Sequence, residues 1–425
     1  MDAMKRGIGS SIILLLFTAM MAAQTEWEKY SENPVLRGSQ SYGILGDFDQ
    51  NEALHPFIIE ENGYYRMWYV GARNNYSVGA AISTDAIHWY VLRGNPLLAP
   101  GPPGSFDAAG IKKICVVHDK REYKMYYYTT AGGVNKIGLA TSPDGYTWTK
   151  YGGNPVLDAG PSGTWDGAGV WAPTVVVQNK SYKMWYQGYD GAIPEIGYAS
   201  IGHATSSDGI HWTKYPGNPV LQHGGPGDFD YYTSGEPFVL QALGRYHLFY
   251  TSTSGSIQNK IGYAVSRDGI SWTKSRNNPV LTAGPSSWDG QGVAAVSVIA
   301  TNRELKMFYV GWGGPRAIGL ATADWDVAIE ADPSQEGLLE TGLLHAYPNP
   351  FNPSTTIRFV VPSEGLVKIV VYDLLGREVA TLVNEFKARG DYSITWNPEN
   401  GASGTYFCRL IVGASTEVRK LLLMK

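Results

Sequence analysis

Short segments rich in aromatic and branched apolar residues recur along most of the chain, and turns containing Gly, Asn or Asp separate them. Runs of this kind, bounded by turn residues, are typical of β-strands. Gly (51), Tyr (28) and Trp (13) are plentiful, which also favours β-structure with many tight turns. The pattern therefore predicts an all-β protein.

The same sequence features return at a nearly constant interval of about 60 residues, the first sign of a repeat architecture. A Trp followed six residues later by Asn-Pro occurs five times: Trp27/Asn33, Trp89/Asn95, Trp148/Asn154, Trp212/Asn218 and Trp272/Asn278. An aromatic-Asp pair follows each Asn-Pro: Phe48-Asp49, Phe106-Asp107, Trp165-Asp166, Phe229-Asp230 and Trp288-Asp289. Each repeat offers four short strands, which suits one blade of a β-propeller.

The ends of the repeat region are complementary, so we expect a closed ring of five blades over residues 24–326. The fifth repeat stops at Trp325-Asp326 without an Asn-Pro, whereas Trp27 to Leu36 opens the chain with that missing piece. The N-terminal strand should complete the last blade, since closure removes exposed strand edges.

Three further segments lie outside the repeats. Lys5 and Arg6 precede the apolar run Ile12 to Phe17 and the small residues Ala22-Ala23, which indicates a signal peptide over residues 1–23. A membrane anchor is the alternative, but Ile12 to Ala23 is shorter than the roughly 20 residues that a span needs. Residues 327–345 break the period and are typical of a linker. Residues 346–425 contain six or seven short strands and predict a small Ig-like sandwich.

Charge and cysteine content exclude several classes of function. The 34 Lys+Arg residues nearly balance the 38 Asp+Glu residues, for a net charge of −4, which argues against a nucleic-acid partner. Cys115 and Cys408, the only two cysteines, lie far apart and provide neither a disulfide framework nor a cysteine zinc site. No EF-hand type acidic loop is present, so we expect no cofactor and no metal site.

The C-terminal segment resembles the C-terminal sorting domain of type IX secretion cargo. The matching residues are Tyr347-Pro-Asn-Pro-Phe-Asn-Pro-Ser-Thr-Thr-Ile357, Val371-Tyr-Asp-Leu-Leu-Gly-Arg-Glu-Val379 and Gly404-Thr-Tyr-Phe407. The resemblance implies that residues 346–425 engage the type IX secretion machinery. The protein would then cross the periplasm and outer membrane, to be released or held at the cell surface. An ordinary Ig-like accessory domain is the alternative.

The repeats resemble the five-bladed glycoside hydrolase superfamily that includes families 43, 32, 62 and 68. The matching elements are the Ser-x-Asp-Gly-x-x-Trp turn, as in Ser142 to Trp148, the Asn-Pro-Val-Leu segment and the aromatic-Asp pair. The resemblance implies a carbohydrate ligand. It also allows a calcium ion in the channel, as in some relatives. We also expect the protein to be a monomer.

Comparison of the repeats separates residues that serve the blade from residues that serve a ligand. The Asp and Trp residues of every repeat should be structural. Six residues beyond each Asp, however, the repeats differ: His55, Lys113, Ala172, Glu236 and Ala295. Three residues beyond the Asp, Glu52 is an exception among small residues. Inner strands line a propeller channel, so these side chains should converge at its mouth.

Glycoside hydrolysis usually needs two carboxyl groups. Glu236 precedes a Pro at the start of an inner strand, a setting similar to the acid motif of the superfamily, and is the candidate general acid. Glu52 is the candidate base, with Asp47 a weaker choice. The candidate substrate-binding residues come from inner strands and mouth loops: His55, Arg73, Lys113, Trp171, Tyr189, Asp190 and Trp312.

The superfamily pattern is not fully kept. Active relatives carry Asp, Asp and Glu on the first three inner strands, where this chain has His55, Lys113 and Ala172. Two functions remain open: a secreted glycoside hydrolase whose site is rebuilt around Glu236, or a non-catalytic propeller that binds sugar or another surface.

Overall fold

The computed structural model describes residues 27–39, 47–61, 63–119, 122–178, 181–191, 198–242, 244–255, 258–285, 288–301, 304–324, 342–361, 364–374, 376–388, 390–398, 401–412 and 415–424. These residues form strands, turns and bends and no α-helix, so the all-β prediction is confirmed; none of them forms a helix suited to crossing a membrane. The chain divides into two compact units, Met1–Ala331 and Asp332–Lys425. The predicted signal peptide and most of the predicted linker lie outside the described residues.

Each repeat of the first unit forms an antiparallel set of three long strands and one outer strand of two residues. We name the strands of a set inner, middle, third and outer. The sets are β2 (Glu52–Glu61), β3 (Tyr64–Ala72), β4 (Tyr76–Ser83), β5 (Tyr90–Val91); β6 (Lys112–His118), β7 (Tyr123–Ala131), β8 (Val134–Ser142), β9 (Thr149–Lys150); β10 (Gly169–Gln178), β11 (Ser181–Tyr189), β12 (Ala199–Ser206), β13 (Thr213–Lys214); β14 (Thr233–Ala242), β15 (Arg245–Thr253), β16 (Lys260–Ser266), β17 (Thr273–Lys274); and β18 (Gly292–Ala300), β19 (Glu304–Trp312), β20 (Ala317–Asp324), β1 (Glu28–Lys29).

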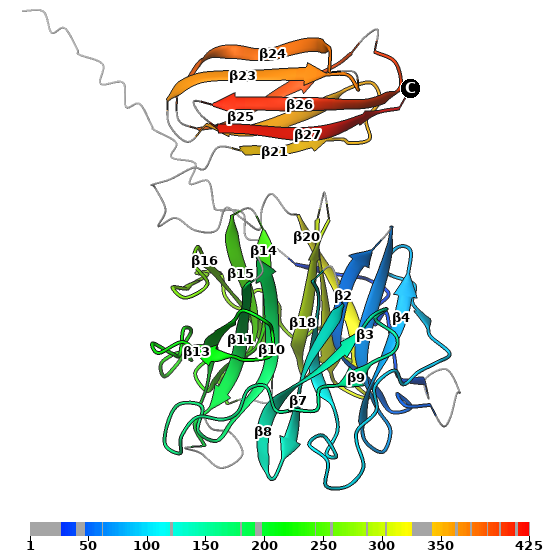
Figure 1. Cartoon of the computed structure of the whole chain (residues 1–425), viewed down its shortest axis with the longest axis vertical. Coiled ribbons are helices and arrows are strands. Elements are labelled where there is room, and N and C mark those ends of the chain that lie inside the picture. Colours follow the sequence, from blue (N-terminus) through cyan, green and yellow to red (C-terminus); the bar gives the residue numbers. More distant parts are fainter. Residues whose placement is uncertain are drawn as a thin grey trace, which may run out of the picture. The chain divides into compact units, whose positions relative to one another are not determined.

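The inner strands contact one another in a cycle, β2 to β6, β10, β14, β18 and back to β2, which is the arrangement of a propeller. Figure 1 shows several of them (β2, β10, β14 and β18) in the middle of this unit. The predicted role of the N-terminal strand is confirmed, because Glu28 and Lys29 of β1 pair with Thr322 and Ala321 of β20.

The repeated tryptophans pack between neighbouring sets, as the repetition predicted. Each lies edge-on against an aromatic ring of the preceding middle strand, with ring centroids 5.6 to 6.3 Å apart. The pairs are Trp148 with Trp68, Trp212 with Tyr126, Trp272 with Trp185, Trp27 with Phe249, and Trp89 with Phe308. The last pair joins the first repeat to the fifth, so the same contact also closes the cycle.

The repeated aspartates are buried structural groups, each no more than 3% exposed. Each accepts a hydrogen bond from a middle-strand tyrosine, and four also pair with an outer-strand lysine at 2.5 to 2.7 Å. The groups are Asp107 with Tyr127 and Lys150, Asp166 with Tyr186 and Lys214, Asp230 with Tyr250 and Lys274, Asp289 with Tyr309 and Lys29, and Asp49 with Tyr69. A buried carboxylate needs such partners, and where both are present they connect the middle and outer strands to one loop.

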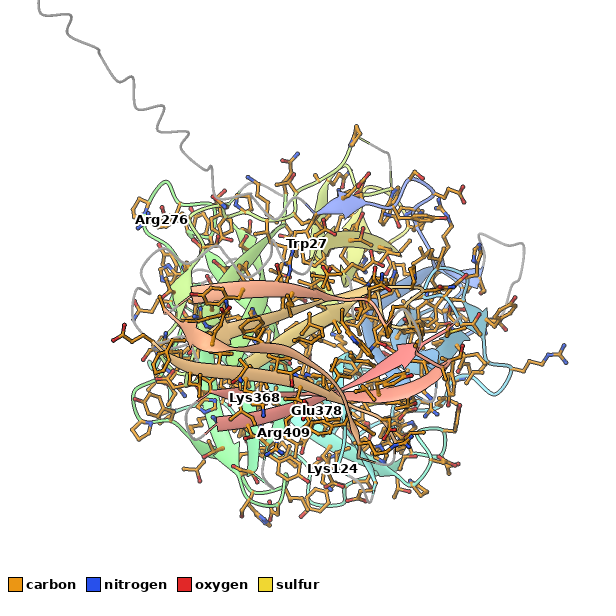
Figure 2. The ribbon with its side chains drawn as sticks, turned by 90° about the horizontal axis from the view of Figure 1, so that it is seen from above. Trp27, Lys124, Arg276, Lys368, Glu378 and Arg409 are labelled. Carbon is orange, nitrogen blue, oxygen red and sulfur yellow. The ribbon has the colours of Figure 1, made fainter. Side chains whose placement is uncertain are left out.

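The second unit contains two antiparallel sheets. One consists of β21 (Gly342–Tyr347), β22 (Thr355–Val361) and β25 (Gly390–Trp396); the other consists of β24 (Glu378–Lys387), β23 (Gly365–Tyr372), β26 (Gly404–Val412) and β27 (Ser415–Leu423). Lys368 and Arg409, labelled in Figure 2, come from the paired strands β23 and β26. Phe359, Trp396 and Leu410 belong to one core fed by both sheets, as in a sandwich. Strand β21 begins at Gly342, inside the segment that the sequence suggested as linker.

In the first repeat, the buried Asp49 lacks the outer-strand lysine that pairs with the aspartate in the other four repeats. A substitution that supplies this lysine should stabilise the protein. Val91 occupies the outer-strand position that is lysine in the other four sets, since it pairs with Ala81 as Lys150 pairs with Ala140. Burial raises the pKa of Asp49, whose carboxylate has no lysine or arginine partner among the described residues. We expect Val91→Lys to raise the free energy of unfolding by about 1 kcal/mol, the net contribution of a typical intramolecular hydrogen bond.

Urea denaturation at pH 7 measures this effect, and Val91→Met, which adds length without charge, is the matched control. An equal gain in both variants would show that side-chain length, and not the charge beside Asp49, is responsible.

Two buried histidines predict how stability depends on pH. His203 is 2% exposed and His247 is 3% exposed, and burial lowers the pKa of each to about 4. An unfolded histidine titrates near pH 6.5, so the unfolded chain takes up protons that the folded protein excludes. The free energy of unfolding should therefore fall as the pH decreases from about 6.5 to about 4.

Unfolding midpoints between pH 7.5 and 4 measure this dependence. His203→Gln should reduce the slope, whereas His118→Gln, which removes an exposed ring at the end of β6, should leave it unchanged. Equal slopes for the wild type and His203→Gln would contradict the assignment.

Candidate functional site

Every inner strand departs from regular β-geometry at the position six residues after the repeated aspartate. The backbone there has a positive φ, and the register with the middle strand shifts at the same place, which marks a β-bulge. The residues are His55 (φ 47°), Lys113 (30°), Ala172 (45°), Glu236 (45°) and Ala295 (54°). A bulge takes its residue out of the hydrogen-bond ladder and re-aims the side chain. Because two alanines also adopt it, this conformation belongs to the architecture.

These positions were expected at the starts of the inner strands, and the structure corrects that detail. Four inner strands begin three residues after the aspartate, at Glu52, Gly169, Thr233 and Gly292. The bulged residues therefore lie within the inner strands. The residues before and after each bulge pair with the middle strand.

Glu236 is fixed by two neighbouring middle strands. Its Oε2 accepts a hydrogen bond from the Thr251 hydroxyl at 2.8 Å, and its backbone N–H donates to Gln187 Oε1 at 2.9 Å. Thr251 Oγ1 also accepts from the N–H of Ala295 at 3.0 Å, so one hydroxyl links the fourth and fifth repeats. These bonds hold the carboxyl group of Glu236 in one orientation.

Lys113 is a buried cation, 3% exposed, whose Nζ has no hydrogen-bond partner. Burial lowers the pKa of Lys113, and the carboxylate of Glu236 opposes that shift. Strands β6 and β14 are not neighbours in the cycle of inner strands, so this interaction acts across the channel.

Glu52 forms a bidentate ion pair with Arg316. Arg316 Nε donates to Oε1 at 2.8 Å and Nη2 donates to Oε2 at 2.6 Å. The guanidinium carbon lies 4.9 Å from the centre of the Trp312 ring. Arg316 immediately precedes β20, so the pair joins the last repeat to the first.

The surroundings of His55 favour its neutral imidazole form. Burial lowers the pKa of His55 well below its usual value, and the charges of Lys113, Arg316 and Lys112 act in the same direction. Its Nδ1 is buried without a hydrogen-bond partner.

Aromatic rings form one wall of this group. Trp171 lies 6.0 Å from Tyr128 and 5.8 Å from Tyr189 between ring centroids, and Lys112 Nζ lies 5.1 Å from the centre of the Tyr76 ring. The indole N–H groups of Trp171 and Trp312 are buried and unpartnered. Flat rings with free donors beside them suit a sugar, which has apolar ring faces and hydroxyl groups.

Seven of the nine predicted site residues thus meet in one network of contacts and charges: Glu52, His55, Lys113, Trp171, Tyr189, Glu236 and Trp312. The other two lie on loops at the same end of the strands and have local bonds. Asp190 Oδ1 accepts from the backbone N–H of Tyr198 at 3.3 Å, and the carbonyl of Arg73 accepts from Asn51 Nδ2 at 3.0 Å.

Sequence comparison missed the middle-strand residues of the site, although a signal for them exists. Tyr128, Gln187 and Thr251 each follow the tyrosine that binds the buried aspartate, and the first and fifth repeats have Val70 and Val310 there. The repeats therefore differ at this position as they do at the bulge, and the same comparison applied to the middle strands finds these residues.

Metal and thiol chemistry have little support in the described part of the chain. No group of three His, Cys, Asp or Glu side chains there is close enough together to hold a metal ion. Cys115 and Cys408 are free and buried, and burial raises the pKa of each thiol to about 12.

Comparisons with known proteins agree with this fold and with the resemblances in the sequence. Residues 172–293 match the glycosyl hydrolases family 32 N-terminal domain, and residues 345–424 match the secretion system C-terminal sorting domain. An uncharacterized protein of Mycobacterium tuberculosis is 26% identical over 278 residues, which cover 62% of this chain and 89% of that protein.

Solved structures of carbohydrate-active enzymes have the same fold as the first unit. A glycosyl hydrolase from Bacteroides ovatus is 18% identical and superposes with a TM-score of 0.58, over 72% of this chain and 95% of its own. A thermostable family-43 glycoside hydrolase is 19% identical, with a TM-score of 0.52 over 63% and 88% of the two chains. A structure from the GH130 family of mannoside phosphorylases, which contains glycoside hydrolases that target beta-1,2 mannosidic linkages in Candida mannan, is 18% identical, with a TM-score of 0.58 over 73% and 97%.

The first unit is therefore a glycoside hydrolase-like propeller, and the second unit is a secretion sorting domain. Both resemblances in the sequence are confirmed. The sorting domain indicates export by the type IX system to the cell surface or the medium.

Proposed function

We propose that the first unit is a five-bladed propeller that binds an oligo- or polysaccharide at the bulged end of its inner strands and hydrolyses a glycosidic bond there. The observation that best supports this proposal is the position of Glu236. Its carboxyl group lies at a bulge, is oriented by Thr251 and is faced by an aromatic wall. The cycle of inner strands and the ring of edge-on tryptophan contacts support the blade number.

Glu236 acts as the general acid in this proposal. The Thr251 hydroxyl donates to Oε2, which leaves Oε1 to protonate the leaving oxygen of the sugar. Trp171 stacks on a sugar ring, and the buried indole and imidazole nitrogens bond its hydroxyl groups.

Glu52 acts as the base, and Arg316 sets its orientation. Both carboxylate oxygens accept hydrogen bonds from the guanidinium, and each oxygen has a second lone pair for a water molecule. His55, Lys113 and Trp312 surround this space, and Arg73, Tyr189 and Asp190 extend the binding surface along the mouth loops.

A non-catalytic sugar-binding propeller is the second candidate, favoured by the same ion pair. A carboxylate bound on both oxygens by arginine is typical of a structural pair, and no inner strand among the first three carries a carboxyl group at its bulge.

Substitution of the two glutamates separates these functions. We expect Glu236→Gln and Glu52→Gln each to lower turnover at least about 100-fold, the scale of lost acid or base catalysis, while glycan binding persists. Glycan arrays measure binding, and reducing-end release from the bound glycans measures turnover. Glu60→Gln, at the exposed far end of β2, is the matched control.

Unchanged turnover in Glu236→Gln would remove its catalytic role. Glycan binding without cleavage by the wild type would establish the second candidate. Binding to no glycan would contradict both functions.

Residues 1–23 act as a cleaved signal peptide and the exported protein is a monomer in this proposal. N-terminal sequencing of the secreted protein should begin near Gln24, and light scattering should give the mass of one chain. A secreted protein that retains Met1, or a mass of two chains, would contradict these assignments.

A further inference from the structure

The carbohydrate site holds more positive charge than a neutral sugar requires. Three cations (Lys112, Lys113 and Arg316) and two carboxylates (Glu52 and Glu236) belong to the network. The Arg316 and Glu52 charges cancel in their bidentate pair. Of the two lysines that remain, Lys113 is acted on by the carboxylate of Glu236.

Neither lysine is neutralised by a hydrogen-bonded carboxylate in the described structure. Lys113 Nζ is buried and has no hydrogen-bond partner at all. Lys112 Nζ lies over two aromatic rings, 5.1 Å from the centre of Tyr76 and 6.0 Å from that of Tyr128. A buried ammonium group without a hydrogen-bonded counter-ion is costly, and an oxyanion on a ligand would supply that counter-ion and stabilise the charged form of Lys113.

Further unpartnered polar atoms belong to the same network. His55 Nδ1 and the indole N–H groups of Trp171 and Trp312 are buried without hydrogen bonds. Indoles only donate, and ammonium groups only donate, so the site offers mainly donors to its ligand. An oxyanion accepts several hydrogen bonds and also carries the missing negative charge. A sugar hydroxyl accepts hydrogen bonds but carries no charge.

We propose that the sugar bound at this site carries an oxyanion, a uronic acid carboxylate or a sulfate ester, that Lys113 and Lys112 receive. This inference rests on the carbohydrate-binding function proposed above and names the class of sugar. The position of Lys113 on the inner strand opposite Glu236 places the acidic group across the channel from the candidate acid.

A simpler role for Lys113 would be to act on Glu236 alone. In that role its loss would change turnover of acidic and neutral sugars equally. If Lys113 instead binds the oxyanion, its loss would weaken the apparent affinity for acidic sugars only. Kd and KM measured for acidic and neutral sugars therefore distinguish the two roles.

The test uses acidic polysaccharides (homogalacturonan, glucuronoxylan and a sulfated galactan) and the carboxyl-reduced or desulfated form of each. We expect the purified protein to bind at least one acidic form at least tenfold more tightly than its neutral counterpart. Lys113→Met should abolish this preference and Lys113→Arg should retain most of it. Lys136→Met removes a lysine that is already paired with Asp158 and is the matched control. Thermal melting checks that each variant is folded.

Several results would overturn the inference while leaving the proposed function in place. These are equal or tighter binding of the neutral forms, an equal loss for both forms in Lys113→Met, or the same preference in Lys113→Met as in the wild type. Inorganic phosphate is included in a separate arm. If millimolar phosphate occupies the lysines and supports binding of the neutral forms, the anion is free in solution and not part of the sugar. Binding to no glycan of either kind would remove the proposed function itself.

Discussion

The propeller depends on one buried interaction, the aspartate that accepts hydrogen bonds from a middle-strand tyrosine and, in four repeats, from an outer-strand lysine. A buried carboxylate without such partners is costly, so the loop that carries it has one stable place relative to both strands. The inner strand begins three to five residues later, and the bulge follows at the sixth. Asp230, for example, fixes the loop that leads to Glu236 through its bonds to Tyr250 and Lys274. The site is therefore positioned by residues that have no part in its chemistry.

At the bulge, the backbone conformation is the same in every repeat, whereas the side chain differs between repeats. Positive φ is unfavourable for residues other than glycine, and yet Ala172 and Ala295 adopt it as Glu236 does. Strain that is shared by every repeat cannot be assigned to catalysis. It supplies equivalent positions around a channel, and the side chain at each position is free to differ. In the proposed function, the differences between His55, Lys113 and Glu236 determine what the site binds.

The sequence predicted the parts that follow from repetition and left open those that need the closed ring. The repeats alone predicted the strands, the pairing of the N-terminal strand with β20, the packing of the tryptophans and the structural role of the aspartates. Glu52 and Arg316 are 264 residues apart, and they meet because the last repeat lies beside the first. Their pairing could not be predicted from spacing. The burial of Lys113 could not be predicted either, because lysine in a short strand is usually exposed.

The ion pair and the free lysines together explain how the superfamily pattern has changed. A site with three carboxylates on its first inner strands would repel an acidic sugar. Here the first two of those positions are imidazole and ammonium, and the one carboxylate opposite them, Glu236, is oriented by Thr251 and not by a cation. Glu52, at the rim of the first repeat, has its charge matched by Arg316 and adds no net repulsion. A negative charge on the ligand then completes the balance that the protein leaves open at Lys113. On this argument, loss of the ordinary carboxylates and gain of the lysines are one change, toward a different class of sugar.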